Sequence, residues 1–157
     1  SGGVKNVMVT NCQFLGTDVG LRFKSARGRG GVVENIYIKD MSMFDIQTDV
    51  VTFDLYYGGK SAVEVLNDGD QKKQQVVDIK KVDETTPAFR NIDINHVICR
   101  GARRAAYFNG LPEMPVQNIS IKDMEVNNAK QGIVINRTEG VTLENIKVSA
   151  KTHTFDA

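Results

Sequence analysis

Short segments in which apolar and polar residues alternate recur along the whole chain, and each begins with asparagine. They have the form Asn-apolar-X-apolar and start at Asn6, Asn35, Asn91, Asn118 and Asn145. Alternation with a period of two is the pattern of a β-strand with one buried face. The spacings between these asparagines are 29, 56, 27 and 27 residues. The chain is therefore predicted to contain a short structural repeat with one much longer interval.

Each repeat carries two further alternating segments. The first has four copies, at Cys12/Phe14, Met41/Met43, Val97/Cys99 and Met124/Val126. The second also has four copies, at 21–24, 51–54, 106–109 and 133–136. Three short strands per repeat are typical of a parallel β-helix, in which coils stack about 4.8 Å apart. We therefore expect an all-β fold, a right-handed single-stranded parallel β-helix of about five coils.

Turn residues are expected where one strand of a coil passes into the next. One position, five residues after each repeat's asparagine, holds Asn11, Asp40, His96, Asp123 and Ala150. Short amides and carboxylates suit such turns because they bond to the local backbone. We interpret His96 as one of these turn residues rather than as a ligand or a base.

The two cysteines are expected to be free thiols. Cys12 and Cys99 lie two coils apart in the predicted stack. Their backbones are then about 10 Å apart, beyond the roughly 7 Å between Cα atoms that a disulfide spans. Both side chains take inward positions, so we predict two mostly buried thiols.

The long interval contains an insertion over residues 58–87 within an otherwise single domain of residues 1–157. Two apolar segments, 62–66 and 76–79, flank an Asn-Asp-Gly turn that begins at Asn67. The insertion is predicted to be either a β-hairpin or a flexible flap. Insertions into solenoids map to one face, which is often the binding face.

Composition narrows the classes of partner. The chain has 157 residues, of which 20 are Lys or Arg and 19 are Asp or Glu, for a net charge of +1. This balance argues against nucleic acid and anionic membranes as partners. No apolar run approaches the roughly 18 residues of a membrane span. The spacing of Cys and His does not fit a zinc site, so no metal and no cofactor are expected.

The candidate binding residues lie on the segment 21–24. Leu21 and Phe23 suit the core, so Arg22 and Lys24 project together from the outer face of the same strand. Two adjacent cations suit a carboxylate or phosphate, because arginine can form two parallel hydrogen bonds and lysine adds a point charge. An ordinary solvated strand and a nucleic-acid patch remain the alternatives.

Two other groups of side chains carry aromatic rings or positive charge. Tyr56 and Tyr57 follow one coil later, where an aromatic ring could stack on a sugar or serve the fold. A second basic cluster is interpreted as solvated surface; it consists of Arg100, Arg103 and Arg104. The aspartates do not gather on one face, so no catalytic set is predicted from the residues themselves.

The segment Gly20-Leu-Arg-Phe-Lys resembles the Arg-Ile-Lys motif of family 28 glycoside hydrolases, the polygalacturonases and their relatives. The segments Asn11-Cys-Gln-Phe and Thr17-Asp-Val-Gly lead into it as they do in that family. Residues 86–91 and 110–115 resemble the form found in Bacteroidetes bacteria. The resemblance covers nearly the whole chain and implies a pectin-lyase-like right-handed parallel β-helix.

The resemblance also implies roles for individual residues. Arg22 and Lys24 would bind the carboxylate of a galacturonate unit next to the cleaved bond, with Tyr57, or Tyr56 as a fallback, beside them. The family hydrolyses its substrate with inversion, using aspartates as acid and base. Those aspartates lie in Asn-Thr-Asp and Asp-Asp motifs, followed by Gly-His-Gly, and none of the three occurs here. We therefore expect the C-terminal half of a pectin-degrading hydrolase, without catalytic residues and inactive alone.

The implied partner is a galacturonate-containing acidic polysaccharide, met in the periplasm or outside the cell. The first coil, residues 4–9, is expected to expose core residues and to promote end-to-end self-association. Two alternative functions stay open: a non-catalytic β-solenoid that binds acidic polysaccharide, and a polysaccharide lyase of the same architecture.

Overall fold

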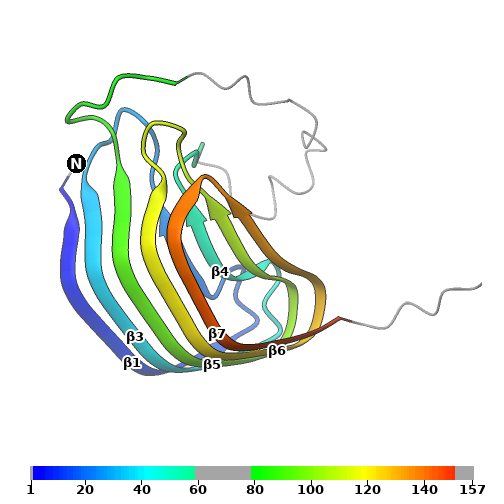
Figure 1. Ribbon diagram of the computed structural model, residues 1–157. Helices are drawn as coiled ribbons and strands as arrows, with labels where there is room; N and C mark the ends of the chain where they lie inside the picture. The colour runs from blue at the N-terminus through cyan, green and yellow to red at the C-terminus, as the bar shows by residue number, and fades with distance from the viewer. Residues whose placement is uncertain (1, 59–78, 151–157) are drawn as a thin grey trace, which may run out of the picture.

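A computed structural model describes residues 2–58 and 79–150 (Figure 1). The strands are β1 (Val4–Leu15), β2 (Leu21–Lys24), β3 (Val32–Phe44), β4 (Asp49–Asp54), β5 (Ala88–Asn109), β6 (Val116–Asn136) and β7 (Thr138–Ala150). In the described ranges all regular structure is β, and nothing there forms a helix that could cross a membrane.

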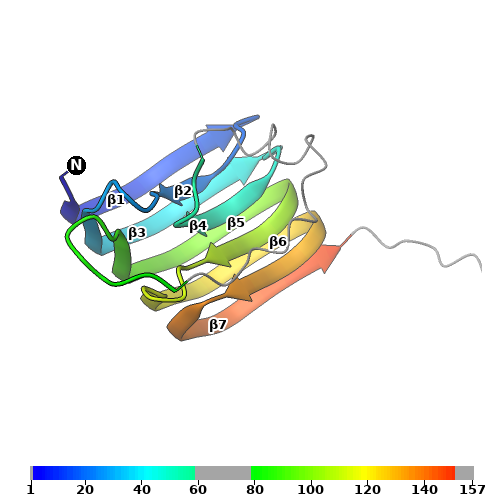
Figure 2. The same cartoon turned by 90° about the horizontal axis from the view of Figure 1, so that it is seen from above.

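Successive strands stack in parallel register as the coils of a right-handed β-helix, which confirms the predicted fold class (Figure 2). Coil 1 contains β1 and β2, and coil 2 contains β3 and β4. Coil 3 is β5, coil 4 is β6, and β7 begins coil 5. The predicted third strand aligns along the stack through Leu21, Val51, Ala106 and Ile133.

Each coil bends around the core and has two outer surfaces that differ in their side chains (Figure 1). The long-strand wall is the outer surface of the first segment of each coil, which includes residues 35–39, 91–95 and 118–122. The short-strand face is the outer surface of β2, β4 and the C-terminal ends of β5 and β6. Parallel pairing places equivalent residues of neighbouring coils side by side on both surfaces.

Residues with left-handed backbone conformation bend the long strands at every fifth position. In coils 2 to 4 they are Asn35, Asp40, Asp45, Asn91, His96, Gly101, Asn118, Asp123 and Asn128. Glycine, asparagine and aspartate reach this region at lower cost than other residues. Asn118 Nδ2 donates to Asn91 Oδ1 at 3.3 Å, so the amides also bond from coil to coil. The repeated asparagines therefore serve the bends.

The fifth coil corrects the predicted repeat. Gly140, not Asn145, is stacked on Asn118, because the pairs on either side of it are in register. Asn145 instead donates from Nδ2 to Asp123 Oδ1 at 2.7 Å. Asn145 thus replaces Ala150 as the last member of the turn position that contains His96.

The shift has a local cause. Only Arg137 separates the end of β6 from the start of β7, whereas longer loops connect the earlier coils. The interval between coils 4 and 5 is therefore shorter than the sequence repeat predicted. Because both bends consist of a short polar residue followed by alternating apolar positions, Asn145-Ile-Lys-Val fits either of them.

The interior of the coils is filled by stacked apolar side chains. The rings of Phe23 and Phe53 lie 4.5 Å apart between centroids, and those of Phe53 and Phe108 lie 5.0 Å apart. Phe53 is completely buried. This aromatic stack lies directly beneath the short-strand face. It gives the outward side chains of the same strands a common, closely packed support.

The open edge of coil 1 exposes core positions, as predicted. Val4 and Val7 retain 47% and 37% of their accessible surface. End-to-end association through this edge stays a prediction. Both cysteines are free; Cys99 is buried and Cys12 is partly exposed. Burial raises the pKa of the Cys99 thiol to about 11.

The described part of the predicted insertion is residue 58 and residues 79–87. The predicted hairpin turn at Asn67 lies outside the described residues. Residues 79–87 contain no strand and run beside the loop that follows β2. There the backbone N–H groups of Gly28 and Gly30 donate to the carbonyl of Thr85 at 3.0 and 2.9 Å. Gly30 has a φ of +61°, and an added Cβ would collide with the carbonyl of Glu84.

Candidate functional site

Strand β2 places two cations on the short-strand face by simple alternation. Leu21 is 8% exposed and packs in the core, and Phe23 stacks on Phe53 beneath the face. Arg22 and Lys24 consequently project outward from the same strand. Arg22 is partly exposed and Lys24 is exposed. The predicted orientation of this segment is confirmed.

Tyr57 comes from the following coil and lies against both cations. The Arg22 Cζ atom is 5.2 Å from the centre of the Tyr57 ring, and Lys24 Nζ is 4.3 Å from it. The backbone N–H of Tyr57 donates to the carbonyl of Ser25 at 3.0 Å. This hydrogen bond holds the segment that follows β4 against the segment that follows β2. The structure brings together all three residues that the sequence singled out for binding.

The two cations differ in their other contacts. Arg22 Nη1 lies 3.8 Å from Asp18 Oδ2, a loose ion pair between side chains that are 26% and 34% exposed. The other oxygen of Asp18 is buried without a hydrogen-bond partner. Such an ion pair is worth little in water. Arg22 and Lys24 therefore keep most of their capacity to bind an external anion.

Asp54 lies one coil beyond Lys24 and is its register partner. Its Oδ1 atom accepts hydrogen bonds from the backbone N–H of Tyr56 and from Asn109 Nδ2, both at 3.0 Å. The bond to Tyr56 closes the turn that carries Tyr57. Burial raises the pKa of the Asp54 carboxyl, and these two hydrogen bonds and the charge of Arg22 oppose that shift.

Arg104 corrects the prediction that the second basic cluster is solvated surface. Its Nε and Nη2 atoms donate to the two carboxylate oxygens of Asp49 at 2.7 and 3.0 Å. The Arg104 side chain is 19% exposed, and its Cζ atom lies 4.0 Å from the centre of the Tyr107 ring. Arg100, by contrast, is exposed as predicted. The pairing follows from the register of β4 with β5, in which Asp49 lies beside Arg104.

A second ion pair, which joins two loops beside Tyr56, was not predicted from the sequence. Arg27 Nε and Nη2 donate to the Glu113 carboxylate at 2.6 and 2.8 Å, and these bonds lower the pKa of Glu113. Arg27 Cζ also lies 5.4 Å from the ring centre of Tyr56. These contacts join loops of coils 1 and 3 around a residue of coil 2. Contacts between loops have no periodic signature, so alternation could not predict them.

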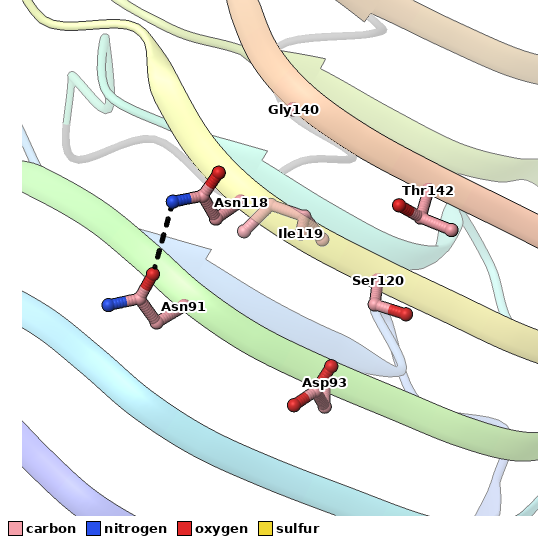
Figure 3. A pocket seen from close by; sticks show the side chains of 7 residues that line it. All are labelled: Asn91, Asp93, Asn118, Ile119, Ser120, Gly140 and Thr142. Carbon is pink, nitrogen blue, oxygen red and sulfur yellow. Dashed lines mark hydrogen bonds between the residues drawn. The ribbon is translucent and has the colours of Figure 1, made fainter.

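A shallow hollow on the long-strand wall is a rival location for a ligand (Figure 3). Its polar lining side chains are Asn91, Asp93, Asn118, Ser120 and Thr142. The lining contains no cation, and two of its amides bond to each other. Nor does any cluster of His, Cys, Asp and Glu among residues 2–58 and 79–150 suit a metal ion. The short-strand face is thus the better candidate for an anionic ligand.

Residues 1–101 of the chain match the sequence profile of glycosyl hydrolases family 28. The chain belongs to this family. A probable polygalacturonase of Arabidopsis thaliana is 26% identical over 132 residues, which are 82% of this chain and 25% of that protein. A probable polygalacturonase of Vitis vinifera is 23% identical over 129 residues, which are 82% of this chain and 23% of that protein. The family-28 chain thus spans about a quarter of the length of these curated relatives. The residues that match the family profile include Arg22, Lys24 and Tyr57.

Proposed function

We propose that this family-28 chain binds the carboxylate of a galacturonate unit in an acidic polysaccharide such as pectin. The observation that carries the proposal is the convergence of Arg22 and Lys24 on the ring of Tyr57 at an outer surface. Two relatives named as probable polygalacturonases support this choice of ligand. In the complete enzyme the reaction would be inverting hydrolysis of α-galacturonosidic bonds.

Each of the three side chains has a distinct task in this proposal. The Arg22 guanidinium forms two parallel hydrogen bonds to the uronate carboxylate, and the Lys24 ammonium adds a point charge. The Tyr57 ring holds both cations by cation–π attraction before the ligand arrives. Side chains that are already ordered lose less conformational entropy on binding, so this arrangement favours affinity.

We propose that this chain contributes substrate binding and not the catalytic acid and base. Three carboxylates around the short-strand face already have partners: Asp18 is ion-paired with Arg22, Asp49 is paired with Arg104, and Asp54 closes the turn before Tyr57. Inverting glycosidases need two carboxyl groups, one of them able to donate a proton and the other able to activate water. We therefore expect binding without hydrolysis by this chain, and action in the periplasm or outside the cell in the complete protein.

The proposal is tested by calorimetric titration with an oligomer of galacturonate. The double variant R22A/K24A removes both cations, whereas K39A/R100A removes two exposed cations elsewhere and serves as the matched control. We expect R22A/K24A to weaken binding at least roughly 100-fold, since two lost charge-assisted hydrogen bonds at about 1.5 kcal/mol each already amount to about 3 kcal/mol. The control variant should bind like the unmodified chain.

Two results would contradict the proposal. An unchanged dissociation constant in R22A/K24A would exclude these cations from the binding site. Hydrolysis would be shown if the unmodified chain released reducing ends from polygalacturonate and R22A/K24A did not. This result would contradict the proposal that the chain binds without hydrolysing its ligand.

A further inference from the structure

The short-strand face changes its charge from one coil to the next. The register partners of Lys24 on coils 2, 3 and 4 are Asp54, Asn109 and Asn136. Those of Arg22 on the same coils are Thr52, Tyr107 and Val134. The outward positions of these two registers therefore carry cations on coil 1 and a carboxylate on coil 2. On coil 3 they carry the aromatic ring of Tyr107 and the amide of Asn109, which is only 7% exposed and donates to Asp54.

The coil spacing makes this order relevant to a polymeric ligand. Neighbouring parallel strands lie about 4.8 Å apart, so the backbone of Asp54 is one such step from that of Lys24. A polysaccharide that extends from the cation pair along the coil axis therefore meets Asp54 next. Beyond Asp54 lies Tyr107. The guanidinium of Arg104 lies against the Tyr107 ring and is already paired with Asp49.

The charges around Asp54 disfavour a second uronate at that position. Arg22 and Lys24 are turned toward Tyr57 and would be engaged by the first uronate. Both hydrogen bonds to the Asp54 carboxylate come from neutral donors, so they leave its charge in place. Two like charges in a partly buried position repel each other more strongly than they do in water. An uncharged sugar, whose hydroxyl groups can donate to a carboxylate, avoids this repulsion.

We propose that Asp54 is a specificity-determining residue that makes the short-strand face prefer a uronate followed by an uncharged sugar over a run of consecutive uronates. The inference rests on the proposed function, because Arg22 and Lys24 must hold the first uronate. A repulsive group placed against the wrong ligand is a common source of selectivity. Asp54 thus has two tasks, one in the turn before Tyr57 and one in ligand choice.

The test compares two oligosaccharides of equal length at pH 7 and low ionic strength. One contains only galacturonate, and in the other galacturonate alternates with an uncharged hexose. The variant D54N removes the charge but keeps an Oδ1 acceptor for Tyr56 and Asn109. Asp93 is an exposed carboxylate on the long-strand wall, so D93N is the matched control for loss of one negative charge.

We expect the unmodified chain to bind the alternating oligomer roughly tenfold more tightly than the all-uronate oligomer. D54N should gain about the same factor for the all-uronate oligomer and keep its affinity for the alternating one. D93N should keep the original preference. Equal binding of both oligomers, or tighter binding of the all-uronate oligomer by the unmodified chain, would overturn the inference.

Two further outcomes separate this inference from the proposed function. If D54N weakens both oligomers equally, Asp54 acts only through the turn and the specificity inference is wrong, while the proposed function stands. If neither oligomer binds the unmodified chain, the proposed function itself is wrong and the inference falls with it.

Discussion

The bends of the long strands use similar residues in every coil, whereas the outward residues of the short-strand face differ from coil to coil. At the bends, the same kinds of residue recur from coil to coil, and Asn35, Asn91 and Asn118 all have positive φ. On the short-strand face, the outward residues change at every coil, from Lys24 to Asp54 to Asn109. Both regions share one parallel register and one core. They differ in whether the same kinds of residue recur at equivalent positions of successive coils.

This difference separates residues that form the solenoid from residues that can recognise a ligand. A backbone bend has the same requirement in every coil, so the same small polar residues satisfy it. A ligand placed across several coils meets different chemical groups at each step, so the residues beneath it need not repeat. The cation pair, the carboxylate and the aromatic ring of the short-strand face fit this second condition.

Loss of the shared core should have the largest effect on stability. F53A removes a completely buried ring that stacks on Phe23 and Phe108. We expect the free energy of unfolding to fall by about 3–5 kcal/mol, measured by chemical denaturation. F44A, at a position that is 56% exposed, is the control and should change stability by about 0.5 kcal/mol or less. Equal effects of the two variants would contradict the described core.

Arg104 lies on the variable side of the coils but serves the fold, because it is paired with Asp49. R104A leaves Asp49, which is 4% exposed, without its partner charge. We expect a loss of about 3 kcal/mol in the free energy of unfolding. R100A, at an exposed arginine, should be nearly neutral. A stability of R104A equal to that of R100A would restore the interpretation of Arg104 as solvated surface.

Substitutions at a bend test the repeating region. Asn118 has a φ of 53° and donates to Asn91. Both N118G and N118A lose this hydrogen bond, but only alanine is strained at positive φ. We expect N118A to be less stable than N118G by roughly 1–2 kcal/mol in thermal or chemical unfolding. Gly140, stacked on Asn118 in coil 5, already shows that glycine fits this position. A more stable N118A would contradict the assigned backbone conformation.

The pH dependence of D54N should be the smallest of these effects. Because burial raises the pKa of Asp54, its protonation stabilises the folded chain at low pH, and this contribution is lost as pH rises through the folded pKa. At pH 7 the neutral amide in D54N avoids the cost of the buried charge. We expect D54N to melt at a higher temperature than the unmodified chain at pH 7. The difference should shrink as pH falls through the raised folded pKa and disappear below the unfolded value of about 4; a constant difference would contradict this cause.

The fold could be predicted because its signal is periodic. Alternation gave the three strands of each coil and the outward direction of Arg22 and Lys24, and the structure confirms both. The register of Asn145 was wrong because the two kinds of bend have the same local sequence form. The predicted alignment of 51–54 with 106–109 already places Asp49 beside Arg104, but alternation does not indicate which side chains form an ion pair. The family resemblance, not periodicity, singled out Tyr57.

We propose that the variable short-strand face binds the ligand. Mapping of backbone amide chemical shifts during titration with an oligomer of galacturonate tests this most directly. The largest changes are expected at Arg22, Lys24 and Tyr57, with little change at Asn91 and Asn118. Changes centred on the hollow of the long-strand wall, with the short-strand face unaffected, would contradict it.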